Sequence, residues 1–341
     1  MKKLIFALIV SLSFSFLAAG ISLAAGPYDS LAPVNLRYGN GAALGAAGDL
    51  WGIAFCKYVE EITNKKITVD YFGNSQLGVD NELQTQMQAG DIDIVSCQPG
   101  QTTTFVPAVA VYDLPLAFAK YDAAAIGKAL NDSPFTKMIN DKYGESKMVC
   151  LGVLQGATFR VMTSNVKITK LDDFKGIKIR TMNSPNHLLF WESLGANPTP
   201  LPFTELYMSL QQGVVQAQEN ANDTNLSSNF HEVQKYLVNI KQLLYMNQFL
   251  MNKAKFESLD PAYQDAIREA VAKATAEIAP QLTAIDSENR DKLVAGGMEE
   301  LNFDDKFYDD VIKASQPVYD EIRKQIGGEI VDALLDALEG K

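Results

Sequence analysis

Histidine is scarce in this sequence of 341 residues, in which His187 and His231 are the only two. Neither lies beside a nucleophile elbow or in an HExxH pattern, so a catalytic triad is not expected. The acidic residues are scattered and the two histidines are far apart in the chain, so no metal site is expected either. The loop 39–45 is only loosely similar to a phosphate-binding loop and lacks the lysine and serine that would follow it. No cofactor is therefore predicted.

Cysteine is also scarce, with Cys56, Cys97 and Cys150 making an odd total. In an oxidising compartment at most one disulfide can form, which leaves one thiol free or paired with another chain. The favoured interpretation is that all three are small buried apolar side chains. Whether any two of them pair stays open at this point.

Positive charge is in deficit, because 30 Lys and Arg residues stand against 41 Asp and Glu residues and the net charge is −11. Such a protein repels the phosphates of nucleic acids, so no nucleic-acid partner is expected. An anion would have to bind at a local cationic site and not through the overall field of the protein.

Long hydrophobic runs are missing after the N-terminus, and the later run 243–251 is interrupted by polar residues. Lys2 and Lys3 precede an apolar run over 4–19, which serines interrupt, and small residues follow over 22–25. A membrane span needs roughly 20 apolar residues, so residues 1–25 are predicted to be a cleaved signal peptide. No cysteine for a lipid anchor lies in the cleavage region. We expect a soluble periplasmic protein without stable membrane insertion.

Short β-like runs alternate with helical ones, which predicts an α/β fold with mostly parallel sheets. The length left after cleavage is more than one compact core usually uses, so two lobes are expected. The first set of predicted elements has strands at 34–39, 66–72 and 91–97, with helices up to 63 and at 82–89. The second set has strands at 148–154, 159–163, 177–181 and 214–218, with helices at 190–194 and 204–212.

The C-terminal third is mainly helical. Asp260 is a helix N-cap followed by Pro261 at the first helical position, and apolar residues recur at helical spacing up to about residue 293. Pro280 should kink or interrupt this helix. Further helices are predicted at 307–326 and 329–338. A helix as long as the first can reach across two lobes and join them.

Arg160 and Arg180 each follow an apolar β-like run and so fall on or beside strands near their ends. Open α/β sheets bind ligands at such ends, and the planar guanidinium fork matches a carboxylate with two parallel hydrogen bonds. The alternative is a surface arginine paired with a nearby acid such as Asp172 or Asp173. The loop 39–48 offers backbone N–H groups for a polar ligand atom.

Several short motifs occur along the chain in a specific order. They are Asn74-Ser-Gln-Leu-Gly78, Gly176-Ile-Lys-Ile-Arg180, Glu192-Ser-Leu-Gly-Ala-Asn-Pro-Thr-Pro200, Thr204-Glu-Leu-Tyr207, Leu210-Gln-Gln-Gly213 and Gln218-Glu-Asn220. In this combination, from about residue 34 to the C-terminus, the chain resembles the solute-binding subunits of tripartite ATP-independent periplasmic (TRAP) transporters of the DctP type. Any one motif alone would be weak.

The resemblance implies a two-lobed periplasmic binding protein fold, with the ligand cleft between the lobes and a long C-terminal helix bridging them. The expected lobes are residues 26–157 with 246–285 and residues 158–245 with 286–341. The partners that it implies are a small organic acid and the TRAP membrane subunits.

The resemblance also implies site residues. Arg180 would form a salt bridge with a substrate carboxylate, Asn220 would donate to the same group, and Arg160 would add a second cationic contact. Phe203 matches a position that often packs on the ligand. The candidate ligand-binding set is completed by Gln98, Trp51 and Asn183.

Three features bear on the ligand. Sialate-binding members have an acid where this chain has Gln98, which makes an amine-rich or polyhydroxylated ligand less favoured. The loop 41–48 is almost wholly Ala, Leu and Gly, and Trp51 follows it, which favours a monocarboxylate with an apolar or aromatic part. A tryptophan on a helix is, however, more often a core residue. Gln216 and Ala217 replace the Asp-Gly that the family often has, which should alter a turn more than the site.

The predicted function is capture of an organic acid and its delivery to the TRAP membrane subunits, without catalysis. C4-dicarboxylates and sugar acids stay open as ligands. A periplasmic enzyme on the same fold would need a base or nucleophile beside the arginines, for which His187 and Glu219 are the candidates. A ligand-sensing partner of a membrane receptor would share every feature of the cleft.

Overall fold

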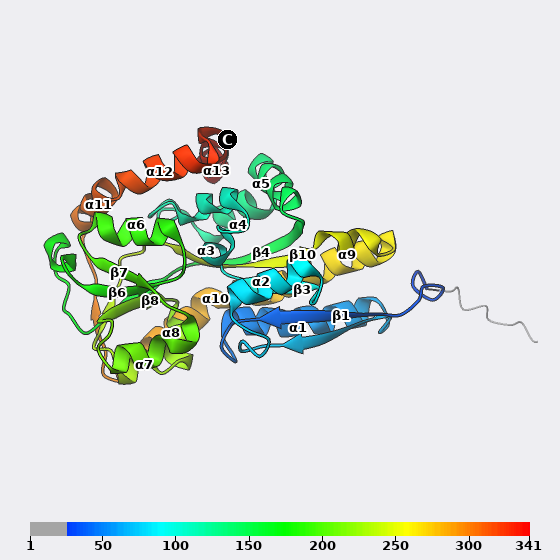
Figure 1. The fold of residues 1–341 in the computed structure, drawn as a ribbon, viewed down its shortest axis with the longest axis horizontal. Helices are drawn as coiled ribbons and strands as arrows, with labels where there is room; N and C mark the ends of the chain where they lie inside the picture. Colours follow the sequence, from blue (N-terminus) through cyan, green and yellow to red (C-terminus); the bar gives the residue numbers. More distant parts are fainter. Residues whose placement is uncertain (1–25) are drawn as a thin grey trace, which may run out of the picture.

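The computed structural model describes residues 26–341, and the predicted signal peptide at 1–25 lies outside the described residues. Two β-sheets with their surrounding helices form two lobes (Figure 1). Sheet A consists of β1 (Val34–Asn40), β2 (Ile67–Phe72), β3 (Ile94–Cys97), β4 (Met148–Phe159) and β10 (Leu244–Asn252), in the order β2-β1-β3-β10-β4. Sheet B consists of β5 (Val161–Ser164), β6 (Lys178–Thr181), β7 (Asn197–Pro200), β8 (Ala217–Asn220), β9 (Tyr236–Val238) and β11 (Glu299–Leu301), in the order β11-β9-β5-β8-β6-β7.

Both sheets are mixed, whereas mostly parallel sheets were expected. Strand β1 is parallel to β2 and β3, and β6 is parallel to β7 and β8. Strand β10 is antiparallel to β3 and β4, and β5 is antiparallel to β8 and β9. The antiparallel strands are those at which the chain changes sheets, since β4 leads through Arg160 into β5 and the chain returns to sheet A as β10. The two crossings pair with each other, because Arg160 N donates to Leu243 O at 2.9 Å.

Helices cover both sheets. Those inserted between the strands of sheet A and around it are α1 (Ala47–Ile62), α2 (Asp80–Ala89), α3 (Pro99–Thr102), η1 (Pro107–Asp113), α4 (Ala123–Asn131), α5 (Pro134–Glu145) and α9 (Lys253–Ser258). Those inserted in sheet B are η2 (Leu171–Phe174), α6 (Pro185–Ser193), η3 (Phe203–Glu205), α7 (Leu206–Gln211), α8 (Asn222–Ser227) and η4 (Phe230–Glu232). The C-terminal helices are α10 (Pro261–Ala295), α11 (Asp305–Ala314), α12 (Gln316–Ile326) and α13 (Gly328–Leu338).

Two large hydrophobic cores support this arrangement. One lies between sheet A and helices α1 and α10 and contains Trp51, Phe249 and Ile267. The other includes Phe135 of α5 and Trp191 of α6 and continues under the C-terminal helices. Helix α13 packs on α4 and α5, whereas α12 packs on α6 and η1, so the C-terminal helices contact elements of both lobes. The expected lobe boundaries stay a prediction.

Helix α10 bridges the lobes, as expected, because it contacts α1 and β4 on the sheet A side and α8 on the sheet B side. Asp260 caps it by accepting a hydrogen bond from Ala262 N at 2.9 Å. It runs for 35 residues, which is about 50 Å at a rise of roughly 1.5 Å per residue. Helix α10 continues through Pro280 without interruption, and the alternative that Pro280 kinks it stays a prediction. The predicted helix 307–326 is divided at Ser315 into α11 and α12. Pro317, in the first turn of α12, has no backbone N–H, so it cannot extend the helical hydrogen bonds of α11.

Candidate ligand-binding site

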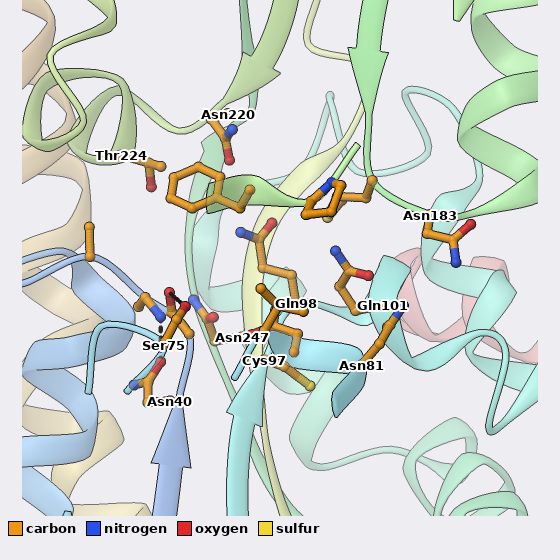
Figure 2. A pocket seen from close by; sticks show the side chains of 18 of the residues that line it. Asn40, Ser75, Asn81, Cys97, Gln98, Gln101, Asn183, Asn220, Thr224 and Asn247 are labelled. Carbon is orange, nitrogen blue, oxygen red and sulfur yellow. Dashed lines mark hydrogen bonds between the residues drawn. The ribbon is translucent and has the colours of Figure 1, made fainter. Parts of the chain in front are cut away.

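A cavity of about 340 Å³ lies between the lobes (Figure 2). Its walls come from strand ends in both sheets, with Asn40 closing β1 and Gln98 following β3 on one side, and Arg180 in β6 and Asn220 closing β8 on the other. Open α/β sheets bind ligands beyond the carboxyl ends of their strands. The position of the cavity is therefore that of a ligand site.

The cavity wall is rich in side-chain amides and poor in charge. Among the described residues that line it, Arg180 is the one cation and Asp80 the one acid. Each amide both donates and accepts hydrogen bonds, so the wall suits a small molecule with several polar atoms around one negative charge. The amides come from Asn40, Asn81, Gln98, Gln101, Asn183, Asn220 and Asn247 (Figure 2).

Arg180 lies in β6 and is 2% exposed. Its Nε donates to the carbonyl oxygen of Leu201 at 2.9 Å, and its guanidinium carbon lies 5.9 Å from the centre of the Phe203 ring. Within residues 26–341, no protein acceptor takes a hydrogen bond from its two terminal nitrogens. Burial lowers the pKa of Arg180 to about 10, against the opposing effect of Glu219 and Asp80. The side chain therefore stays charged at neutral pH, and its two terminal nitrogens are available to a carboxylate.

Asp80, the first residue of α2, lines the same cavity and was not among the predicted site residues. Burial raises the pKa of Asp80 to about 7, although Arg180 and the backbone amide of Gln98 act to lower it. Its carboxyl group lies against Gly41, and a Cβ at that position would lie 2.1 Å from Asp80 Oδ1, so a larger residue there would displace the Asp80 side chain. A sequence signal was available, since Asp80 stands two residues after Gly78, the last residue of the first family motif.

Asn220 is held in one orientation by its neighbours. Its Oδ1 accepts a hydrogen bond from Arg160 at 3.0 Å, and its Nδ2 donates to Gln218 Oε1 at 2.8 Å. Gln218 is fixed in turn, because its Nε2 donates to Thr163 and Asn225, each at 2.8 Å. A side-chain amide has two N–H donors. Asn220 therefore keeps one donor for a ligand in the cavity that it lines.

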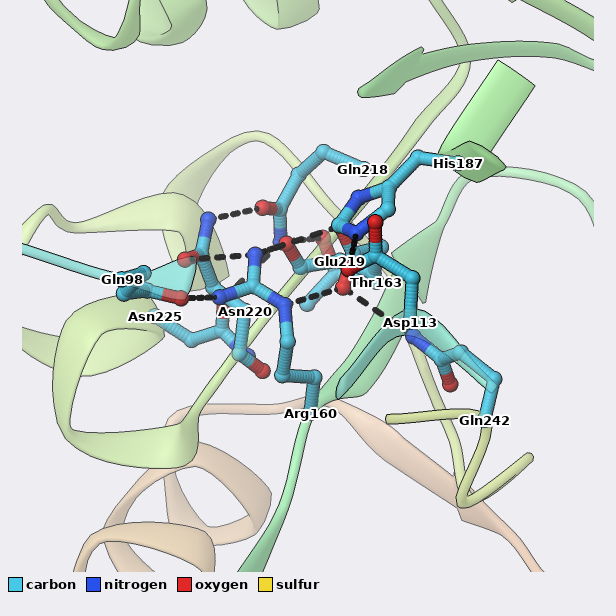
Figure 3. A network of polar contacts seen from close by, with 10 residues as sticks. All are labelled: Gln98, Asp113, Arg160, Thr163, His187, Gln218, Glu219, Asn220, Asn225 and Gln242. Carbon is cyan, nitrogen blue, oxygen red and sulfur yellow. Dashed lines mark hydrogen bonds and ion pairs between the residues drawn. The ribbon is translucent and has the colours of Figure 1, made fainter. Parts of the chain in front are cut away.

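Arg160 does not line this cavity, because protein groups occupy its guanidinium (Figure 3). It is 2% exposed and donates to both carboxylate oxygens of Glu219, and to the backbone oxygen of Glu219 at 2.6 Å. It also donates to Gln98 Oε1 and to Asn220 Oδ1. The expected contact of Arg160 with the ligand stays a prediction. In this arrangement Arg160 positions Gln98 and Asn220, which both line the cavity.

The remaining predicted residues divide into two groups. Phe203 and Gln98 line the cavity, and Asn183 lines it from an exposed position. Trp51 does not line it, and the structure places this residue in the core instead. It is 0% exposed, its ring meets Phe249 edge-on with centroids 5.5 Å apart, and its Nε1 donates to Thr275 Oγ1 at 3.1 Å. The apolar surface near α1 comes from the loop residues 42–43.

His187 and Glu219, the candidates for an enzyme, both have structural partners. His187 Nε2 lies 3.0 Å from Asp113 Oδ1, and both side chains are buried (Figure 3). The other carboxylate oxygen of Asp113 accepts hydrogen bonds from Ser184 at 3.1 Å and from Asn186 at 3.2 Å. Glu219 pairs with Arg160. Neither candidate lines the cavity.

Three observations on residues 26–341 complete the description of the site. Cys56, Cys97 and Cys150 are free thiols, and Cys97 lines the cavity from a buried position. Over these residues, no group of three His, Cys, Asp or Glu side chains is arranged to hold a metal ion. No helix in the described part of the chain combines the length and the apolar character needed to cross a bilayer.

The two lobes are joined by crossing strands and a bridging helix, and a polar cavity lies between them. This arrangement is that of a two-lobed solute-binding protein. Residues 51–325 match the bacterial extracellular solute-binding proteins, family 7, and the chain belongs to this family. It is the solute-binding protein of a TRAP transporter, a class of transport proteins and not of enzymes.

Three relatives illustrate the match. The chain is 27% identical over 305 residues to the sialic acid-binding periplasmic protein SiaP of Vibrio cholerae, which covers 89% of this chain and 92% of the relative. It is 29% identical over 257 residues to the 2,3-diketo-L-gulonate-binding periplasmic protein YiaO of Escherichia coli. This match covers 75% of this chain and 77% of the relative. The chain is also similar to the crystal structure of the sugar acid binding protein DctPAm of Advenella mimigardefordensis in complex with galactonate, with 28% identity and a TM-score of 0.85. This match covers 91% of this chain and 99% of the DctPAm chain.

Proposed function

We propose that this protein binds the carboxylate of a small organic acid through Arg180 and presents the acid to the membrane subunits of a TRAP transporter. The observation that carries the proposal is the buried, charged Arg180, whose terminal nitrogens have no protein acceptor within residues 26–341. A buried ion pair repays its desolvation only when the remaining donors and acceptors are also satisfied. The second N–H of Asn220 is suited to that purpose. The names of SiaP, YiaO and the DctPAm complex each state an acid as ligand, which supports the proposal.

Capture in this proposal proceeds by closure of the lobes. The acid first meets the lobe that carries Arg180, and the lobe of sheet A then closes over it. Closure expels water from the ion pair and strengthens the interaction between the charges. The closed protein then docks on the membrane subunits.

The proposed ligand carries one carboxylate. A second carboxylate would find no other cation among the described lining residues and would meet Asp80. The apolar or aromatic part that we expect has a surface to contact in Phe203, Met182 and Ala42. A sugar acid is the second candidate, and the amides of the cavity wall favour it, because amides pair well with hydroxyl groups. Asn40 is the exception, since its amide already bonds to Gly48, Tyr71 and Ala42.

The test is isothermal titration calorimetry with a panel of galactonate, succinate, benzoate and 2-oxoisovalerate, using the Arg180→Ala variant. Removing Arg180 leaves the bound anion unpaired, so we expect binding to weaken by roughly 3–5 kcal/mol, several hundredfold or more. Arg290→Ala is the matched control, because Arg290 pairs with Asp291 on the exposed surface of α10. Unchanged affinity in the Arg180→Ala variant would remove the proposed role.

A further inference from the structure

Helix α1 begins without a cap from its own residues. Its N-cap residue is Ala46, whose methyl group cannot accept a hydrogen bond, and no local side chain takes that part. The first N–H groups of a helix have no partner inside the helix and need one elsewhere. Here the backbone N–H of Ala47 donates to Asp223 Oδ2 at 2.8 Å. Asp223 belongs to α8, 176 residues later in the chain and in the other lobe.

The contact between Ala47 and Asp223 lies beside the ligand cavity and joins its two walls. On the sheet A side, the loop that leads into α1 lines the cavity through Gly41, Ala42 and Ala43. On the sheet B side, Thr224 lines the cavity, and its hydroxyl donates to Asp223 Oδ1 at 3.1 Å. Asp223 itself does not line the cavity. It therefore links the two walls without meeting the ligand.

The energetics of this contact depend on how close the lobes are. A carboxylate at a helix N-terminus satisfies an unpaired N–H and interacts favourably with the helix dipole. Asp223 is 7% exposed, so salt and water screen this interaction little. If the lobes separated, the N–H of Ala47 and the carboxylate of Asp223 would both return to water, and the contact would no longer contribute. The contact would therefore stabilise an arrangement in which the two lobes meet, relative to one in which they have separated.

We propose that Asp223 stabilises the closed arrangement of the lobes by capping α1 across the cleft, and that it thereby sets ligand affinity without touching the ligand. The inference rests on the proposed capture of an acid between the lobes. Asp223 is a positioning residue. If the protein closes less readily, a smaller fraction of it is in the closed state, and the apparent affinity for the ligand falls by the same factor.

The first test compares Asp223→Ala and Asp223→Asn with Asp122→Ala. Asp122 is a matched control, because its side chain caps α4 at the same distance of 2.8 Å, from Ala125 N, but within one lobe. The probe is whichever of galactonate, succinate, benzoate and 2-oxoisovalerate binds the unmodified protein most tightly. We expect Asp223→Ala to weaken binding about tenfold, the range typical of a lost cap. Asp223→Asn should weaken it less, because asparagine keeps one acceptor oxygen for the Ala47 N–H, although it loses the second oxygen that accepts from Thr224.

Two further readouts separate closure from simple stability. The loss in Asp223→Ala should appear in a faster dissociation rate, because the contact belongs to the closed arrangement that must open before the ligand can leave. Asp122→Ala should lower the unfolding temperature and leave affinity unchanged. Wild-type affinity in Asp223→Ala, or an equal loss of affinity in Asp122→Ala, would overturn the inference.

A second test needs no ligand. Hydrogen exchange of the amides in residues 42–49 should be faster in Asp223→Ala than in the unmodified protein, and unchanged in Asp122→Ala. Equal exchange in all three proteins would overturn the inference. Failure of every acid to bind would overturn the proposed function instead, and this exchange experiment would still decide the role of Asp223.

Discussion

Arg160 and Glu219 form a buried ion pair, in which Nε and one terminal nitrogen of the guanidinium donate to the carboxylate and each side chain is at most 2% exposed. The pair balances its own charge inside the protein. Arg180, which lies close enough for both groups to affect its pKa, is left as the cation that faces the cavity. Two arginines that look alike in the sequence therefore differ in the structure, one positioning amides and the other available to an anion.

Breaking this pair should destabilise the fold. Glu219→Gln leaves the buried guanidinium of Arg160 without a countercharge, and we expect a loss of about 3–5 kcal/mol in the free energy of unfolding, measured in urea. Combining it with Arg160→Met should cost much less than the sum of the two single substitutions. Asp291→Asn, which breaks the exposed pair with Arg290, should cost less than about 1 kcal/mol. Strictly additive losses for Arg160 and Glu219 would contradict the ion-pair account.

Ligand affinity should depend on pH through Asp80. Because its pKa is raised to about 7, Asp80 is largely ionised at pH 8 and largely protonated at pH 6. The ionised form repels a ligand carboxylate and competes for Arg180, so affinity for an organic acid should rise as pH falls through this window. We expect a gain of about three- to tenfold from pH 8 to 6, measured by calorimetry with a panel acid. Asp80→Asn should show a flat profile, and a persisting slope in that variant would assign the effect to another group.

Asp286 should destabilise the protein at neutral pH. Burial and the nearby Asp223 raise its pKa to about 6 from its ordinary value of 3.8, while Asn222 opposes the shift by donating to it at 3.1 Å. The folded state therefore binds a proton more readily than the unfolded state between these values, and the contribution of Asp286 to stability falls as pH rises through that window. Its side chain is partly exposed, so we expect Asp286→Asn to add only about 1–2 kcal/mol at pH 7 and nothing at pH 4. Urea titrations at both pH values test this, and an equal effect at both would refute it.

The close packing of α10 on β4 should require glycine at position 156. A Cβ on Gly156 would lie 2.4 Å from Leu282 Cβ, which sits on the helix and cannot swing away. Gly156→Ala should therefore lower the free energy of unfolding by about 1–3 kcal/mol, through overpacking. Gly127→Ala in α4 is the control, since its Cβ would meet only the flexible end of Gln155 and alanine favours a helix. If both variants unfold at the same temperature, the helix has room that the structure does not show.

Local signals account for what the sequence predicted well. The Asp260-Pro261 pair marks the start of α10, and hydrophobic runs locate β1, β2 and β6 to within a few residues. Arg180 was placed correctly near a strand end by the run that precedes it. Such signals work because a cap, a proline or an apolar run acts on neighbouring residues, whatever the rest of the chain does.

Strand β10 could not be predicted from local sequence signals. All nine of its residues are buried, so it has no alternation of apolar and polar residues, and its central Asn247 and Gln248 make it look interrupted. Both polar residues have tertiary roles, since Asn247 lines the cavity and Gln248 accepts a hydrogen bond from Tyr143. Its antiparallel pairing with β3 and β4 depends on the return of the chain from the other lobe, which no short window contains.

The sequence by itself determined the α/β class and the family, and it marked Arg160 and Arg180 as two candidate cations, because these depend on short motifs and on periodicity. Only the tertiary structure decided that Arg160 pairs with Glu219, that Trp51 packs on Phe249 and that Asp223 caps a helix of the other lobe. Each of these contacts joins residues tens to hundreds of positions apart. Their partners are chosen by burial and by the need to satisfy charges and hydrogen bonds once the lobes have formed.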